Sequence, residues 1–267
     1  MTDRRTFITA AGGAALAAAN VATPAQPRPN ASRSFVLVHG AWHGGWCWTR
    51  VASRLQAAGH RVFAPSLTGL GDRVHLANPN ITLDTHIADV VNLIDAEELD
   101  RVILVGHSYG GAVITGVAHR VGARLAHLVY LDAIVLKDGE SWSNYESPSG
   151  NTQRANVAAK NNGAWPKPNA NAFGIADAND AAWVNRRMTP QPHGPYVGKV
   201  RVGEPYASLP KTFIDCSKPA LASIEPYRKF VKGNPAWKVI DLPTSHDAMV
   251  TAPGPLADIL LGLASTT

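Results

Sequence analysis

The stretch Gly106-His107-Ser108-Tyr109-Gly110-Gly111 decides the fold, because it carries a G-x-S-x-G motif between a strand and a helix. The apolar run 101–106 precedes it, and a pattern rich in small residues, 110–121, follows it. A turn this sharp needs small neighbours and exposes the serine at the end of the strand. The motif predicts Ser108 as a nucleophile, with the N–H of Tyr109 at a helix N-terminus as an oxyanion donor.

Short apolar runs and amphipathic stretches alternate on both sides of this motif. Such alternation is typical of an α/β domain with a mostly parallel sheet that helices cover on both faces. The predicted strands are 34–38, 61–65, 101–106, 125–131, 211–216 and 237–242, and the predicted helices are 46–58, 83–97, 110–121, 224–231 and 255–263.

The alternation stops between residues 135 and 206, where Asn, Pro and Gly are frequent. Because a structureless loop of this length is uncommon in a compact domain, we expect a helical cap inserted after the strand that follows the nucleophile helix. Scattered aromatic residues there indicate an apolar pocket, although each can equally belong to the core of the cap. Our candidate substrate-binding residues are Trp42, Tyr109 and Trp183.

A glycine-rich loop, 39–46, follows the first predicted strand. Glycines let backbone amides approach a ligand closely, so the N–H of Ala41 is the second candidate oxyanion donor. His39 and His43 lack an accompanying cluster of metal ligands, and we expect them to hydrogen-bond the loop instead.

The base and the acid of a triad come from later in the chain. His246 lies directly after the last predicted strand. Enzymes with a G-x-S-x-G nucleophile carry their triad in the order serine, acid, histidine along the chain, and His246 fits this order. Two carboxylates compete for the acid: Asp132 ends the strand after the nucleophile helix, and Glu225 lies in the segment that usually donates the acid. We prefer Glu225 and keep Asp132 as the alternative.

Four segments together resemble a known group of enzymes: V-L-V-H-G-A-W-H-G-G-W-C-W (36–48), G-L-G-D-R (69–73), V-G-H-S-Y-G-G (105–111) and S-H-D-A-M (245–249). They look like the α/β-hydrolase branch of plant hydroxynitrile lyases and methyl esterases, and bacterial carboxylesterases of the pyrethroid-hydrolase type look most similar. The likeness covers most of 34–134 and 208–264. It implies an α/β-hydrolase fold, with Ser108 as nucleophile, His246 as base, and the N–H groups of Ala41 and Tyr109 as oxyanion hole.

Two departures from the group matter. Plant members place an Asp just past the strand that corresponds to 211–216, where this chain has Ser217-Lys218-Pro219. Lyases of the group carry Thr and Lys at the positions of Gly40 and Asp247, so the lyase interpretation falls behind.

We therefore expect a serine esterase that cleaves lipophilic carboxylic esters, with an aromatic or bulky acyl group, through an acyl-enzyme. No metal or organic cofactor is implied. The alternatives are a lactonase or C–C hydrolase on the same fold, a hydroxynitrile lyase, and a non-catalytic ligand receptor. The natural partner is a small-molecule ester, and a homodimer is left open.

The first 30 of the 267 residues read as an export segment rather than as part of the domain 31–267. Arg4-Arg5 resembles a twin-arginine motif, and an Ala-rich stretch and a polar spacer follow, with cleavage expected near 19–25. We expect export to the periplasm or secretion, with a cytoplasmic protein as the alternative. A net charge of +5 without basic runs argues against nucleic acid and membrane insertion. Cys47 and Cys216 read as buried free thiols, with a disulfide as the alternative in an exported protein.

Overall fold

The computed structural model describes residues 32–266. The predicted export segment lies outside these residues, so it stays a prediction. In the described part of the chain, no helix combines the length and apolar character that a membrane crossing would need. Residues 32–266 belong to one compact unit.

A six-stranded parallel sheet forms the centre of this unit, in the order β2-β1-β3-β4-β7-β8. Its strands coincide with the six predicted runs to within two residues at each end. They are β1 (Ser34–Val38), β2 (Arg61–Phe63), β3 (Val102–His107), β4 (Leu125–Leu131), β7 (Lys211–Cys216) and β8 (Trp237–Leu242). All six residues of β3 are buried, as expected for a central strand with helices on both faces.

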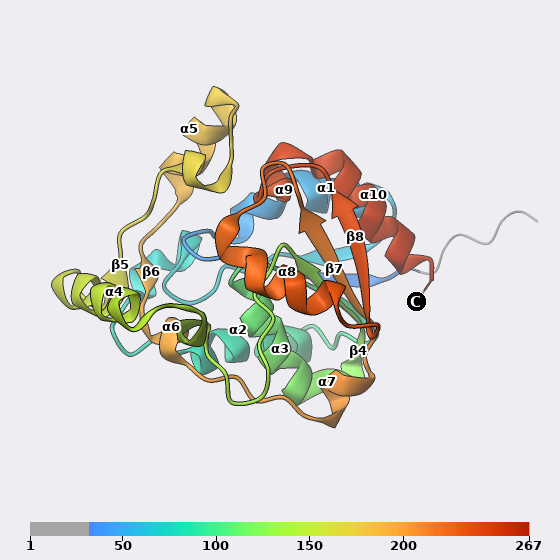
Figure 1. Cartoon of the computed structure of the whole chain (residues 1–267). Coiled ribbons are helices and arrows are strands. Elements are labelled where there is room, and N and C mark those ends of the chain that lie inside the picture. Colours follow the sequence, from blue (N-terminus) through green and yellow to red (C-terminus); the bar gives the residue numbers. More distant parts are fainter. Residues whose placement is uncertain (1–31, 267) are drawn as a thin grey trace, which may run out of the picture. The chain divides into compact units, whose positions relative to one another are not determined.

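Helices cover both faces of the sheet, as predicted (Figure 1). One core contains residues of α2 (Leu83–Ala96), α3 (Gly110–Val121) and α8 (Glu225–Lys232). The other contains residues of α1 (Thr49–Ala57), α9 (Ala248–Thr251) and α10 (Pro253–Ala264). The even and odd residues of β1 divide between the two cores, which is the alternation of a strand that is buried on both sides.

We predicted a helical cap between β4 and β7. The insertion there differs from this prediction, because it also contains a two-stranded antiparallel sheet. Its elements are α4 (Pro148–Lys160), β5 (Ala164–Trp165), α5 (Ala178–Arg187), β6 (Gln191–Pro192), α6 (Gly194–Val197) and α7 (Glu204–Ser208). The paired strands have two residues each, which is too short for an alternating pattern to reveal them. Figure 1 shows α4, α5, β5 and β6 projecting from one end of the sheet, whereas α7 packs on α3.

Short 3₁₀ helices complete the described elements. They are η1 (Gly45–Trp48), η2 (Gly71–Leu76), η3 (Gly122–Arg124), η4 (Trp142–Tyr145), η5 (Ala170–Phe173) and η6 (Ala222–Ile224).

The register of β3 and β4 brings two site candidates to the same edge of the sheet. His107 of β3 pairs with Leu131 of β4, so the next residues along the two strands, Ser108 and Asp132, lie side by side. The N–H of Ser108 donates to Leu131 O at 3.1 Å, and the N–H of Asp132 donates to Ile214 O at 2.8 Å. Both side chains therefore start from the carboxyl ends of neighbouring parallel strands, where open α/β sheets bind ligands.

Candidate active site

The turn that carries Ser108 has the backbone geometry that its sequence predicts. Ser108 adopts a φ of 52°, in the left-handed region that L-residues rarely occupy. A Cβ on Gly110 would lie 2.7 Å from Val38 O, and one on Gly106 would lie 2.6 Å from Gly110 O. Glycine at both positions is what allows β3 to turn sharply into α3. Trp42 and Asp132 also have positive φ, and strained residues of this kind gather at functional sites.

His246 is buried and hydrogen-bonds Asp132. Its Nδ1 lies 2.7 Å from Asp132 Oδ2, and the other carboxylate oxygen accepts from the guanidinium of Arg228 at 2.8 Å. Arg228 is itself buried and also forms an ion pair with Asp215. Arg228 could not be predicted from the sequence, since a basic residue one turn into an amphipathic helix has no local feature that marks it. Its contact with Asp132 places a positive charge beside the carboxylate that contacts His246.

The structure brings His246 together with Asp132 and not with Glu225, the acid that we preferred from sequence. Glu225 begins α8, its side chain is 48% exposed, and its carboxylate contacts Arg228 at 3.2 Å and Lys229 at 3.8 Å. The physical reason is the sheet: Asp132 leaves β4 beside Ser108, whereas the chain after β7 runs through a turn before it reaches α8. The preference for Glu225 rested on position along the chain, which does not fix position in space.

Ser108 and His246 line the same cavity, of about 530 Å³. Since Nδ1 of His246 contacts Asp132, Nε2 is the nitrogen that remains for a proton from Ser108. Ser108 Oγ makes no hydrogen bond with His246 among the described residues. Contacts of this kind commonly tighten only when substrate binds. The remaining walls are mostly apolar or aromatic and include Ile134, Trp142, Phe173, Leu221 and Tyr227.

His39 holds the glycine-rich loop through both ring nitrogens, as expected. Its Nε2 accepts from the N–H of Leu67 at 3.0 Å, so the proton lies on Nδ1, which donates to Gly40 O at 2.8 Å. Burial lowers the pKa of His39 to about 3, so the ring stays neutral. The carbonyl it bonds belongs to the peptide that contains the N–H of Ala41. Within the described chain, neither this N–H nor that of Tyr109 has a hydrogen-bond acceptor.

The side chain of Tyr109 does not line the cavity of Ser108, so it differs from our substrate-binding prediction. It is fully buried, and its hydroxyl lies 2.8 Å from His86 Nδ1. The other nitrogen of His86 donates to Thr68 O at 2.9 Å, which leaves Nδ1 to accept from Tyr109. This chain of hydrogen bonds connects the start of α3 to α2 and to the loop after β2.

Replacing His86 by glutamine is expected to weaken the acid dependence of stability. Burial lowers the pKa of His86 from 6.5 to about 4 in the folded chain. Its folded pKa is depressed, so its contribution is present above pH 6.5 and is lost as the pH falls toward about 4, because unfolding then takes up a proton. The loss amounts to about 3 kcal/mol. Urea unfolding at neutral and acid pH checks this, and parallel pH curves for the two proteins would contradict it.

The two tryptophans proposed for substrate binding lie in different places. Trp42 lines the cavity of Ser108 and also an adjoining one. Trp183 on α5 contacts the ring of Trp46 edge-on at 5.0 Å, and the guanidinium groups of Arg50 and Arg187 lie 5.2 and 4.8 Å from its centre. It lines neither of these cavities, so its contacts assign it to packing of the insertion.

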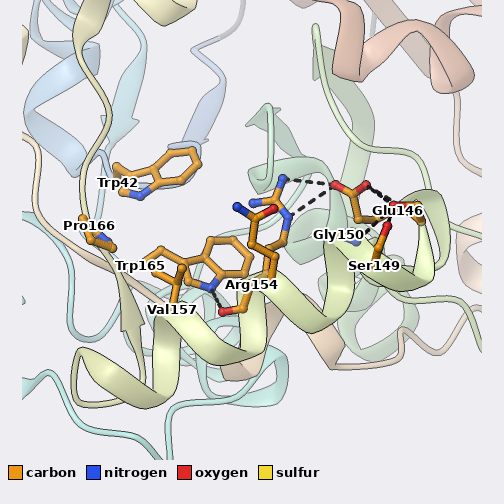
Figure 2. A pocket seen from close by; sticks show the side chains of 10 residues that line it. Trp42, Glu146, Ser149, Gly150, Arg154, Val157, Trp165 and Pro166 are labelled. Carbon is orange, nitrogen blue, oxygen red and sulfur yellow. Dashed lines mark hydrogen bonds and ion pairs between the residues drawn. The ribbon is translucent and has the colours of Figure 1, made fainter.

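The adjoining cavity, of about 550 Å³, lies between α4 and the loop of Trp42. Figure 2 shows Arg154 at its centre, with its guanidinium near Glu146 and its backbone oxygen bonded by the indole N–H of Trp165. The guanidinium lies 4.9 Å from the ring centre of Trp165 and 3.3 Å from the Glu146 carboxylate. Trp42, Glu146 and Arg154 line both cavities, so the two spaces share a wall.

Among the described residues, one group has the proximity of metal ligands: His107, His246 and Asp247, whose ligand atoms lie within 4.8 Å of one another. Two of its nitrogens already have partners. His246 Nδ1 contacts Asp132, and His107 Nε2 lies 3.1 Å from the carbonyl of His246. The group therefore fits a hydrogen-bond network better than a metal centre. Cys47 and Cys216 are buried and free, as predicted.

Comparison with known proteins places the chain among enzymes of one family. The profile of the alpha/beta hydrolase family matches residues 35–259. The carbendazim hydrolyzing esterase of Nocardioides sp. (strain SG-4G) is 44% identical over 86% of this chain and 99% of its own length.

Two solved structures share the fold. A methylesterase from Arabidopsis has a TM-score of 0.72 at 24% identity, over 88% of this chain and 100% of its own. A pyrethroid hydrolase from Sphingobium faniae JZ-2 has a TM-score of 0.66 at 23% identity, over 87% of this chain and 97% of its own. These findings confirm the resemblance noted in the sequence and support carboxylic ester hydrolysis as the enzyme class. The chain belongs to the alpha/beta hydrolase family.

Proposed function

We propose that the chain hydrolyses lipophilic carboxylic esters through an acyl-enzyme on Ser108, with His246 as base and Asp132 as the acid of the triad. The observation that carries this proposal is the 2.7 Å contact between His246 Nδ1 and Asp132. It fixes the tautomer of a histidine that lines the cavity of Ser108. A serine, a histidine and an orienting carboxylate in that arrangement are the elements of serine acyl transfer.

The reaction follows from these positions. Ser108 Oγ attacks the ester carbonyl while His246 Nε2 takes its proton, and Asp132 stabilises the imidazolium that forms. The oxygen of the tetrahedral intermediate accepts from the N–H groups of Ala41 and Tyr109, each lowering the barrier by about 3 kcal/mol. His246 then protonates the leaving alcohol, and afterwards it activates the water that releases the acid.

The cavity walls support a flat or bulky apolar substrate. Apolar and aromatic side chains surround Ser108, and the adjoining cavity provides further room beyond Trp42. The mostly apolar cavity of Ser108 suits small lipophilic molecules, whereas the adjoining cavity also has polar side chains on its walls, among them Glu146, Gln153 and Arg154. The similarity to a carbendazim hydrolyzing esterase adds carbendazim as a candidate substrate.

Replacing Trp42 by alanine is expected to raise KM for an aromatic ester about tenfold, because one large apolar contact in a pocket contributes about 1–3 kcal/mol. 4-Nitrophenyl benzoate and 4-nitrophenyl acetate, compared in steady-state kinetics, show whether the loss follows the aromatic acyl group. Trp183→Ala is the matched control, since Trp183 lines neither cavity, and its KM should change less than twofold. Equal changes in the two variants would contradict this placement of the substrate.

The proposed function is tested by incubating the purified protein with a short 4-nitrophenyl ester and, separately, with carbendazim. Product analysis should show acid and alcohol in equal amounts from the nitrophenyl ester. Absence of hydrolysis of every ester would overturn the proposal. Products of lactone opening or C–C cleavage from matching substrates would favour the corresponding alternatives.

The hydroxynitrile lyase alternative has a steric argument against it. A Cβ on Gly40 would lie 2.9 Å from both Ser108 Cβ and His107 Nδ1, so a threonine does not fit there without movement of the loop. The position after His246 holds a carboxylate, Asp247, rather than an ammonium group.

A further inference from the structure

A buried acid and a buried histidine connect the two loops on either side of the proposed site. His43 belongs to the glycine-rich loop after β1, and Asp247 follows His246. His43 is 1% exposed and Asp247 is 0% exposed. His43 Nε2 lies 3.1 Å from Asp247 Oδ2, and His43 Nδ1 lies 2.8 Å from Ala41 O. The two side chains therefore bridge the loop with the candidate oxyanion donor and the loop with the candidate base.

The protonation of this pair follows from its partners. The carbonyl of Ala41 can only accept, so Nδ1 of His43 carries a proton. If His43 were neutral, its Nε2 would be a bare acceptor facing a carboxylate oxygen, and two acceptors repel each other. A second proton is therefore needed between the ring and Asp247, and an imidazolium beside a carboxylate satisfies both contacts.

The surroundings support the charged form of the pair. Burial by itself lowers the pKa of His43, but the Asp247 carboxylate outweighs burial and raises it above its usual value. Burial by itself raises the pKa of Asp247, and the His43 imidazolium outweighs that effect and lowers it.

None of the other titratable groups that we find beside Asp247 among the described residues takes the place of His43 as its positively charged partner. His107 Nε2 lies 3.6 Å from Asp247 Oδ1, yet that nitrogen bonds the carbonyl of His246, and burial lowers the pKa of His107 well below its usual value. Burial raises the pKa of the Cys47 thiol well above its usual value, and the negative charge of Asp247 raises it further, so the thiol stays neutral. The Nδ1 of His246 hydrogen-bonds Asp132 and not Asp247. The rings of Trp46 and Phe173, at 5.3 and 5.5 Å from His43, complete the enclosure.

We propose that the His43–Asp247 ion pair positions the catalytic groups, because it holds the glycine-rich loop, which carries the N–H of Ala41, against the loop of His246. The proposal rests on the proposed function, because it assigns Ala41 to the oxyanion hole and His246 to the base. The pair touches the carbonyl of Ala41 on one side and is the chain neighbour of His246 on the other. Neither side chain is among the residues that line the cavity of Ser108, so both act through their neighbours.

Breaking the pair should lower kcat and leave KM nearly unchanged. Asp247→Ala is expected to lower kcat about 100-fold, because small displacements of positioned groups cost that much, with KM within about threefold. Phenylboronic acid, which forms a tetrahedral adduct with a nucleophilic serine, should bind more weakly by a similar factor. Asp247→Asn keeps a hydrogen bond to His43 and should retain more activity than Asp247→Ala, which a loss of folding alone would not explain.

The ionisation is tested independently of activity by NMR of ¹⁵N-histidine-labelled protein. At pH 7 we expect protons on both ring nitrogens of His43, and on one nitrogen in Asp247→Asn. His43→Gln assigns the signal. His127→Gln is the matched control for losing a buried histidine, because His127 bonds Thr212 near the start of β4, away from Ser108.

Each outcome decides a different statement. A singly protonated His43 in an active enzyme overturns the ion pair. A doubly protonated His43 with unchanged kcat in Asp247→Ala overturns the positioning role, and so does an equal kcat loss in His127→Gln. If the wild-type chain hydrolyses no ester, the proposed function fails and the positioning role fails with it, whereas the NMR result for the pair still stands.

Discussion

Replacing Ser108 by alanine is expected to lower kcat for a 4-nitrophenyl ester by a factor of about 1,000 or more. The variant lacks the Oγ that forms the acyl-enzyme, and what remains is stabilisation by the oxyanion hole and by binding. Ser108 and alanine carry the same Cβ, so the positive φ of this residue strains both proteins alike. The measurement is initial rates for both proteins, with unfolding curves to confirm equal stability.

Ser223→Ala is the matched control for Ser108→Ala. Ser223 lines the same cavity, but no catalytic partner is assigned to it, so its variant should keep kcat within about threefold. Equal rates for wild type and Ser108→Ala would show that the G-x-S-x-G turn is not the working site on esters. The receptor alternative would then gain, and slow single turnover with a retained ligand would support it.

Replacing Asp132 by asparagine is expected to lower kcat by a factor of about 10⁴. An asparagine amide can donate to His246 Nδ1, which selects the tautomer with its proton on Nε2, and that nitrogen then cannot accept the proton of Ser108. Glu225→Gln is the matched control, because Glu225 contacts Arg228 at the surface end of the same network. Its kcat should change less than about threefold, as expected for a half-exposed charge that touches no reacting group.

Stability separates the catalytic effect of Asp132 from a structural one. Arg228 loses one buried carboxylate in Asp132→Asn but keeps Asp215, so the variant should unfold at lower urea concentration and still be folded in the assay. If Glu225→Gln loses as much kcat as we expect for Asp132→Asn, while Asp132→Asn stays active, the assignment of the acid from the structure is wrong.

Local patterns predicted most of the fold. The strand before Ser108 and the helix after it are encoded within about 20 residues, and the motif between them has one geometry. The insertion was harder to predict from sequence, because the two-residue strands β5 and β6 depend on contacts that form only on folding. The different places of Trp42 and Trp183 have the same origin, since the local sequence around an aromatic residue does not show whether its side chain lines a cavity or fills a core.

The proposed acid illustrates why some parts of the site were not predictable from sequence. Asp132 and His246 lie 114 residues apart, and only the pairing of β3 with β4 places Asp132 beside Ser108. The same holds for the contact of Arg228 with Asp132 and for the contact between His43 and Asp247, whose partners come from distant segments. Spacing in the chain reports on local turns and helices, whereas these contacts depend on which strand edges meet.

The central claim is that Ser108 is a nucleophile activated by His246, and covalent trapping tests it most directly. A fluorophosphonate forms a stable bond between serine Oγ and phosphorus as fluoride leaves, and peptide mass spectrometry locates the adduct. We expect one phosphonyl group on Ser108 in the wild-type chain, none in Ser108→Ala, and labelling slowed by at least about 100-fold in a His246→Ala variant. Labelling at another residue, or no labelling of a protein that hydrolyses esters, would contradict the claim.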